Sequence, residues 1–175
     1  MEYRLLHSEE LQPSLFSQFD RFQKVTDCWR KRDGVWVVEP VVFTEQWGPE
    51  EYQFLCQCLQ NTLHTGGAVF GAFDEGVLKG FASVEGPALG SRRQYRDLSS
   101  IHVSRELRGK GAGRQLFALA CRWAKEHGGE KLYISAHSSV ESQAFYRAMG
   151  CREAEEYDPA HVEKEPCDCQ LEYVL

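Results

Sequence analysis

The sequence Tyr95-Arg-Asp-Leu-Ser-Ser-Ile-His-Val103, followed by Ser104-Arg-Glu-Leu-Arg-Gly-Lys-Gly-Ala-Gly113, decides how this chain folds. Its first part is rich in apolar, aromatic and β-branched residues, which favour a strand. After the glycines, apolar residues recur at helical spacing through Leu116, Leu119 and Trp123. The middle of this stretch is therefore predicted to be a turn that joins a strand to a helix.

The turn carries three glycines, Gly109, Gly111 and Gly113, which let the backbone bend sharply and come close to a ligand. The first N–H groups of the following helix have no partner within the helix and attract anions. Arg108 and Lys110 add positive charge, which suits a pyrophosphate. The alternative is a glycine-rich connector whose basic residues are only solvated.

The motif Arg108-x-x-Gly111-x-Gly113, preceded by Ile101-x-Val103, resembles the pyrophosphate-binding signature of the GNAT superfamily of acyl-CoA-dependent N-acetyltransferases. It lacks the Gly-x-x-Gly interval of a dinucleotide fingerprint and the Gly-Lys-Ser or Gly-Lys-Thr of a P-loop. The resemblance implies that acetyl-CoA is the co-substrate. The residues expected to hold it here are Ile101, His102, Val103, Arg108, Gly109, Lys110, Gly111, Ala112 and Gly113.

Composition limits the class of protein. A chain of 175 residues that is 42% hydrophobic fits a single domain over residues 1–175. The net charge of -6 argues against a nucleic-acid partner. No run approaches the roughly 18 apolar residues that span a bilayer, so we expect no membrane partner and a cytoplasmic location.

Seven cysteines are an odd number in a chain too large to need disulfides, which indicates reduced thiols. Cys56 and Cys58 would point apart on a helix. Cys167 and Cys169 would share a strand face, but no second Cys/His pair at zinc spacing accompanies them. We therefore expect no metal, and a thiol-rich metal or redox protein is only a third reading.

The first half of the chain is predicted to contain one short strand, two helices and two hairpins. The strand covers 3–6, a helix begins at Pro13 with a stripe of Leu15, Phe19 and Phe22, and a second helix begins at Gly48-Pro49. One hairpin lies at about 25–38, before Pro40, and the other spans 68–85. A loop with Gly86, Pro87 and Gly90 then leads to the signature strand.

In the signature strand, Leu98 and Ile101 are three residues apart and would lie on opposite faces of a regular strand. A bulge near Ser99-Ser100 would restore a common face. Further along, Lys131 to Ala136 is predicted to be a buried strand, and Ser138-x-x-Glu141 a capping box for a helix through Met149. Strands at 151–154 and 167–174 complete the chain.

This order of elements resembles the GNAT arrangement over nearly the whole chain, with a hairpin added between the first two helices. The resemblance implies a mixed α+β fold (α/β in the broad sense), the GNAT acyl-CoA N-acyltransferase fold, in which a mostly antiparallel central sheet is flanked by helices on both faces.

The segment Ala144-Phe-Tyr-Arg-Ala-Met-Gly150 resembles the second GNAT motif, in which a helix places a tyrosine near the acyl sulfur. Tyr146 is therefore the expected general acid, protonated at neutral pH and able to donate to the CoA thiolate. The alternative for Tyr146 is core packing. Ser139 stands where the family often has a pantetheine-binding asparagine, so it is either a cofactor contact or a helix cap.

An acceptor amine must lose a proton before it attacks, which calls for a base. Asp97, eleven residues before Arg108, stands where several GNAT enzymes have a basic glutamate, and Glu85 ends the preceding strand. Asp97 is the first candidate and Glu85 the second. Each carboxylate could instead form a salt bridge to Arg92, Arg93 or Arg96, and a water network could replace both.

The predicted function is direct transfer of the acetyl group of acetyl-CoA to a primary amine of a small molecule or peptide, possibly a cationic one. No cysteine has an evident histidine partner for a covalent route. We expect the acceptor to lie against the inserted hairpin, with Trp29 and Trp36 as its wall. Alternatives are that these rings serve packing or a homodimer contact, and that the chain is a non-catalytic acyl-CoA-binding or sensing module.

Overall fold

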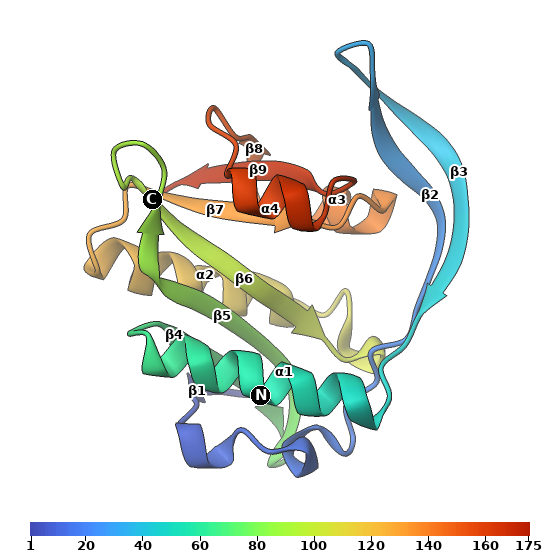
Figure 1. The fold of residues 1–175 in the computed structure, drawn as a ribbon. Helices are drawn as coiled ribbons and strands as arrows, with labels where there is room; N and C mark the ends of the chain where they lie inside the picture. Colours follow the sequence, from blue (N-terminus) through green and yellow to red (C-terminus); the bar gives the residue numbers. More distant parts are fainter.

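The computed structural model describes residues 1–175, and a seven-stranded sheet in the order β1-β4-β5-β6-β7-β9-β8 forms its centre (Figure 1). All neighbouring strands are antiparallel except β6 and β7, which are parallel. The strands are β1 (Glu2–Leu5), β4 (Ala68–Asp74), β5 (Val77–Leu89), β6 (Tyr95–Val103), β7 (Lys131–Ala136), β8 (Arg152–Glu153) and β9 (Cys169–Val174). The predicted mixed fold with a mostly antiparallel sheet is confirmed.

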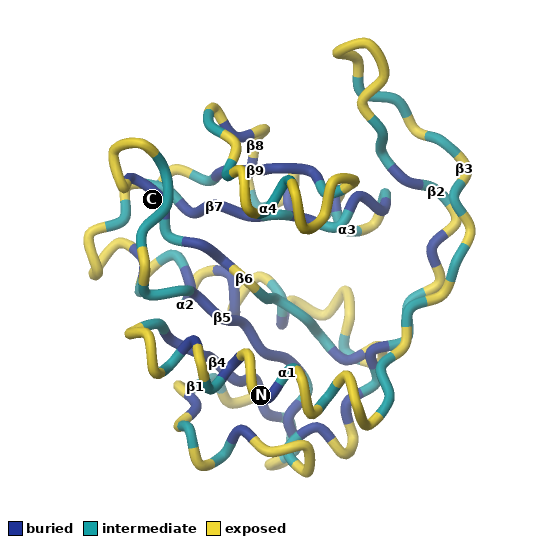
Figure 2. Tube along the Cα trace, in the orientation of Figure 1, coloured by how far each residue is buried: buried dark blue, intermediate teal, exposed yellow.

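Helices pack on both faces of this sheet, and the apolar core has a layer on each side. The helices are α1 (Pro49–His64), α2 (Ala112–Glu126), α3 (Val140–Met149) and α4 (Pro159–Lys164). Leu116 and Phe117 of α2 join Tyr146 of α3 in the larger layer, whereas Cys56 and Leu59 of α1 lie in the other. Figure 2 shows that buried positions follow the central strands and the inner sides of α1 and α2.

The predicted helix from Pro13 is wrong. The chain forms only two 3-10 turns there, Ser8–Glu10 and Pro13–Phe16. The rings of Phe16 and Phe19 both pack edge-on or tilted against Phe81 of the sheet, with centroids 5.4 and 5.6 Å away. Because the segment must bury both rings against the sheet and α1, this packing overrides its weak helical pattern.

The inserted hairpin is longer than predicted. It consists of β2 (Gln23–Arg32) and β3 (Val35–Glu45), and Asp33-Gly34 forms its turn with positive φ at both residues. Pro40 lies inside β3, beside the register shift where the hairpin has an irregularity, so its missing N–H breaks no regular ladder. In Figure 1 the hairpin stands at the side of the sheet, between the end of β6 and α3.

The predicted bulge in β6 is confirmed. Ser83 pairs with Ser100 and Val84 with Leu98, so Ser99 is an extra residue. Leu98 and Ile101 consequently pack in the same core layer. By contrast, β5 continues to Leu89 through the expected loop, because its end pairs again with the start of β6.

The second half of the chain differs from the prediction in two details. The cap of α3 is Ser139, which accepts a hydrogen bond from the Ser142 N–H, and Ser138 instead contacts the hairpin through Trp29. The strand expected at 151–154 is reduced to β8, and the unforeseen α4 fills the space before β9. Gly150 ends α3 in the left-handed region, as expected.

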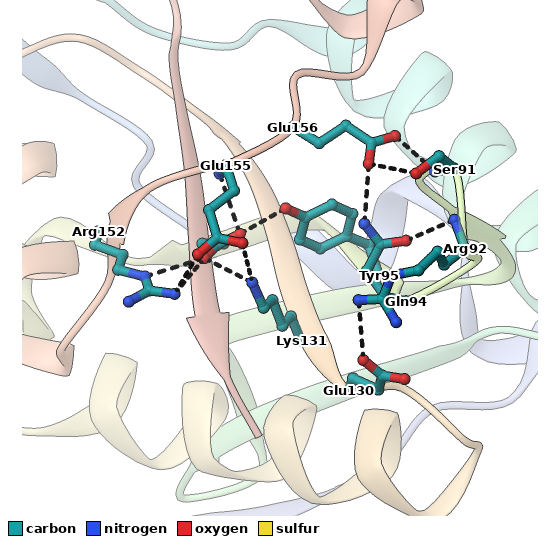
Figure 3. Close-up of polar contacts among 10 residues, drawn as sticks. Ser91, Arg92, Gln94, Tyr95, Glu130, Lys131, Arg152, Glu155 and Glu156 are labelled. Carbon is teal, nitrogen blue, oxygen red and sulfur yellow. Dashed lines mark hydrogen bonds and ion pairs between the residues drawn. The ribbon is translucent and has the colours of Figure 1, made fainter.

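A buried carboxylate ties together the far end of the sheet. Glu172 of β9 is fully buried and accepts hydrogen bonds from Tyr95 (2.5 Å), Lys131 (3.0 Å) and Arg152 (3.0 Å). Figure 3 shows Lys131, Arg152 and Glu155 gathered at this point. Burial alone would raise the pKa of Glu172, but these bonds outweigh it and lower the pKa to about 2.

We expect Glu172→Gln to destabilise the fold by about 3 kcal/mol at neutral pH, since the pKa is lowered by more than two units. A lowered carboxyl pKa gives stability that is present above its ordinary value of 4.5 and is lost as pH falls toward about 2. Denaturant unfolding at several pH values should therefore show the two proteins converging in acid. Glu130→Gln, at an exposed pair with Arg92, is the control and should cost under about 1 kcal/mol. An equal loss for both variants would contradict this account.

Candidate active site

The site is a cleft of about 1250 Å³ that opens where β6 and β7 separate. These strands pair only from Tyr95 with Lys131 to Asp97 with Tyr133. Beyond that point the residues of β6 from Leu98 to Val103 line the cleft instead of pairing with β7. The backbone edge of β6 is thus available to an extended ligand.

One end of the cleft is built to hold an anion. Gly111 caps α2 with φ at 92°, and the N–H groups around it lack any hydrogen-bond acceptor in the protein. The N–H groups concerned are those of Gly109, Gly111, Ala112, Gly113 and Arg114. Together with the positive end of the α2 dipole they form a cradle for phosphate oxygens.

The predicted basic residues of this end have different tasks. The Arg108 guanidinium donates to the carbonyls of Val103, Phe22 and Arg21, at 2.9, 2.7 and 3.1 Å. It therefore holds the loop against the start of the hairpin, and its charge acts on the cleft from there. Lys110 is exposed, and its only hydrogen bond is from its backbone N–H to the Leu107 carbonyl, so its ammonium is free to meet an anion.

The three strand residues expected to bind the cofactor all line the cleft. Ile101 and Val103 belong to the larger core layer, so mainly their backbone faces a ligand. His102 packs against Phe81 and Trp47, at 5.3 and 4.9 Å between ring centroids. Burial lowers the pKa of His102 to about 3 and keeps the ring neutral.

Tyr146 also lines the cleft, and only 9% of the residue is exposed. Burial raises the pKa of Tyr146, so the phenol stays protonated at neutral pH. Ser139 is fully buried, caps α3 and is absent from the cleft lining. Its contacts are therefore those of the helix cap and not those of a cofactor ligand.

The two candidate bases lie beside the cleft rather than in its lining. Glu85 accepts hydrogen bonds from Thr62 of α1 (2.8 Å) and Ser99 (2.5 Å). Asp97 is 6% exposed and contacts Nε2 of His161 at 2.7 Å. Neither carboxylate forms the alternative salt bridge to Arg92, Arg93 or Arg96.

Sequence reasoning missed several ionisable side chains that line the cleft, among them Glu45, His137 and Asp168. Glu45 at the end of β3 pairs with Arg21 (2.5 Å) and with His137 (3.0 Å). Asp168 accepts from the Ser135 hydroxyl at 3.0 Å, and burial raises the pKa of Asp168. They come from separate elements and share no local motif, so only the tertiary fold brings them together.

Trp29 and Trp36 line a separate cavity of about 140 Å³ behind the hairpin. The Arg147 guanidinium lies 4.4 Å from the centroid of Trp29, and the Trp36 indole N–H donates to Glu153. The rings thus fasten the hairpin to α3 and β8. The hairpin residues that line the main cleft are Gln23, Lys24, Cys28, Arg30, Phe43 and Glu45.

A split sheet with an anion cradle at a helix start is the fold of acyl-CoA-binding acetyltransferases, and comparison with known proteins agrees. Residues 16–151 match the model of the acetyltransferase (GNAT) family. The chain belongs to this family. A comparison with curated proteins finds no significant match.

Solved structures share the fold at low sequence identity. A Bacillus anthracis protein described as a streptothricin acetyltransferase, in complex with acetyl coenzyme A, is 16% identical with a TM-score of 0.72, covering 99% of this chain and 98% of its own. A nourseothricin acetyltransferase is 20% identical with a TM-score of 0.64, covering 98% and 95%. PaiA N-acetyltransferase from Thermoplasma acidophilum, in complex with coenzyme A, is 16% identical with a TM-score of 0.61, covering 99% and 98%.

Two other features of the chain bear on its class. No three side chains of the metal-ligating types gather where they could hold a metal ion, and all seven cysteines are free. No helix has both the length and the apolar character needed to cross a membrane.

We expect Gly111→Ala to weaken coenzyme A binding at least about tenfold, because a side chain at φ 92° distorts the N–H cradle. Isothermal titration with coenzyme A measures the affinity. Gly128→Ala is the matched control: this glycine at the far end of α2 also has positive φ and open space around a Cβ. Equal affinities for the two variants would contradict a phosphate site at Gly111.

Proposed function

We propose that this protein is an N-acetyltransferase that moves the acetyl group of acetyl-CoA directly to a primary amine. The observation that carries the proposal is the continuous path from the N–H cradle at Gly111, along the unpaired edge of β6, to the protonated Tyr146. A pyrophosphate at the cradle would place the pantetheine arm along β6 and the thioester near Tyr146.

The residues of the path match the needs of acyl transfer. A backbone N–H of the unpaired β6 edge can stabilise the negative charge on the thioester oxygen. Tyr146 can donate its proton to the departing thiolate. Cys28 and Cys167 line the cleft, but neither has a histidine partner, which supports direct attack by the amine over a covalent route.

The acceptor is proposed to be a small molecule or peptide with a cationic amine. Glu45, Glu165 and Asp168 line the cleft, and their carboxylates suit a positive charge. Similar structures include a nourseothricin acetyltransferase and a ribosomal-protein-alanine N-acetyltransferase, so both classes deserve testing. Seven free thiols fit a reducing compartment, and we place the enzyme in the cytoplasm.

The proposal is tested by incubating the protein with acetyl-CoA and a panel of amines: nourseothricin, spermidine, lysine amide and an alanine-terminated peptide. Thiol release above the rate without amine, with an acetylated product by mass spectrometry, supports it. Tight acetyl-CoA binding with no transfer to any amine would favour the non-catalytic binding module instead.

We expect Tyr146→Phe to lower kcat by about 100-fold while coenzyme A affinity changes less than threefold, because the phenol acts on the leaving sulfur in the transition state. Tyr3→Phe, in the first sheet edge strand, should leave both quantities unchanged. Steady-state kinetics with the identified acceptor and coenzyme A titration measure the two quantities. Equal kcat values for wild type and Tyr146→Phe, with chemistry rate-limiting, would show that Tyr146 only packs in the core.

A further inference from the structure

Asp97 lies at the vertex of the split sheet. Asp97 and Tyr133 are the last residues that pair β6 with β7, and the next residue, Leu98, already lines the cleft. The anion cradle is at the opposite end of the same edge, near Gly111. Whatever group accompanies Asp97 at the vertex therefore lies at the acyl end of the cofactor path.

That group is His161 of α4. Its Nε2 is 2.7 Å from Oδ2 of Asp97, and its ring stacks on Tyr133 with centroids 5.5 Å apart and planes 21° apart. The backbone N–H of His161 donates to Asp158, which caps α4. The imidazole is thus fixed in orientation by a carboxylate, an aromatic face and its own helix cap.

The contact with Asp97 determines which nitrogen is basic. The Asp97 carboxylate accepts from Nε2–H, which leaves the lone pair on Nδ1, and Nδ1 has no hydrogen-bond partner in the protein. The His161 side chain is 25% exposed. Glu165, the residue that follows α4, lines the cleft, and His161 lies one turn before it, outside the lining.

We propose that His161 is the general base that takes the proton from the acceptor amine, with Asp97 as its positioning residue. This inference rests on the acetyl transfer proposed above. It gives Asp97 an indirect role and explains why a carboxylate that does not line the cleft stands at the vertex of the site.

The proposed step balances as follows. The acceptor ammonium gives a proton to Nδ1, and the amine lone pair then forms the C–N bond. The C–S bond breaks with its electron pair on sulfur, and the thiolate takes the proton of Tyr146. The amide nitrogen loses a second proton, which restores the Tyr146 phenol, and His161 returns its proton to solvent.

The charges around His161 set the pH at which this base works. Its hydrogen bond to Asp97 is the main cause that raises the pKa of His161, Asp158 raises it further and Lys164 opposes them. Tyr133 and Asp168 face the same region from β7 and the segment before β9. Because only neutral imidazole accepts a proton, activity should rise with pH through the pKa of His161, and Asp97→Asn should move that rise to lower pH.

The first experiment measures this pKa directly by NMR titration of the histidine ring signals, with the His161 signal assigned from His161→Gln. In Asp97→Asn the pKa of His161 should fall, because the carboxylate that raises it is gone. An unchanged pKa of His161 in Asp97→Asn would overturn the pairing on which the inference rests.

The second experiment compares two nucleophiles. With the amine found in the panel, His161→Gln should lose about 100-fold in kcat/KM at pH values above the pKa of His161 and below that of the amine, where the ring is neutral and the amine protonated. The loss should be smaller at higher pH, where the amine is already neutral. With hydroxylamine, which is mostly neutral near pH 7, the loss should be under about threefold. His64→Gln is the control and should match wild type with both.

The outcomes separate the two proposals. If wild-type protein acetylates neither the panel amines nor hydroxylamine, the proposed acetyl transfer is overturned, and so is the role of His161 as its base. If wild type transfers acetyl groups but His161→Gln loses the same factor with both nucleophiles at every pH, the role of His161 is structural and only this inference is overturned.

Discussion

The parting of β6 from β7 after Asp97 and Tyr133 is the constraint on which the rest of the structure depends. A parallel pair that stops after three residues leaves backbone donors and acceptors of β6 without partners inside a central sheet, where such groups are costly unless they find other bonds. An extended ligand with amide groups supplies those bonds. The bulge at Ser99 helps, because the extra residue turns the strand while Leu98 and Ile101 stay in the core.

An open sheet needs support on both sides of the gap. At the closed end, Glu172 draws Tyr95 of β6 and Lys131 of β7 to one carboxylate, which fixes the strands where they do pair. At the open end, the β2–β3 hairpin bonds to Ser138 through the Trp29 N–H, and Glu45 reaches His137 across the gap. The hairpin thus joins the two halves that the split would otherwise leave apart, in agreement with its position in Figure 1.

The sequence was informative where the structure follows from neighbouring residues. The span of β6, its bulge and the glycine turn before α2 each depend on local spacing, and all three are found. The helix expected from Pro13 fails because the packing of Phe16 and Phe19 on Phe81 is a contact between distant segments. Trp29 and Trp36, expected as a wall for the acceptor with packing as the alternative, line a separate cavity and contact Arg147 and Glu153. Local sequence does not reveal this packing, because both partners are more than a hundred residues away.

The candidate site also has a part that local sequence predicts and a part that it does not. The cradle around Gly111 and the position of Tyr146 belong to motifs of consecutive residues, which the sequence reveals. Glu45, His137 and Asp168 had no such signal, since each comes from a different element. His161 was hidden because its short helix was not foreseen and because its significance depends on Asp97, which lies 64 positions earlier.

The fold shifts the pKa values of His102 and His161 in opposite directions. His102, packed between aromatic rings with Arg21 nearby, has its pKa lowered to about 3 and stays neutral throughout the physiological range. The pKa of His161 is raised instead, because the Asp97 carboxylate accepts its ring N–H. The fold therefore keeps the His102 ring neutral beside the cofactor path and favours protonation of the His161 ring beside Asp97. In the proposed reaction, the proton that an incoming amine releases passes to His161, whereas the neutral His102 ring lies along the strand that would hold the pantetheine arm.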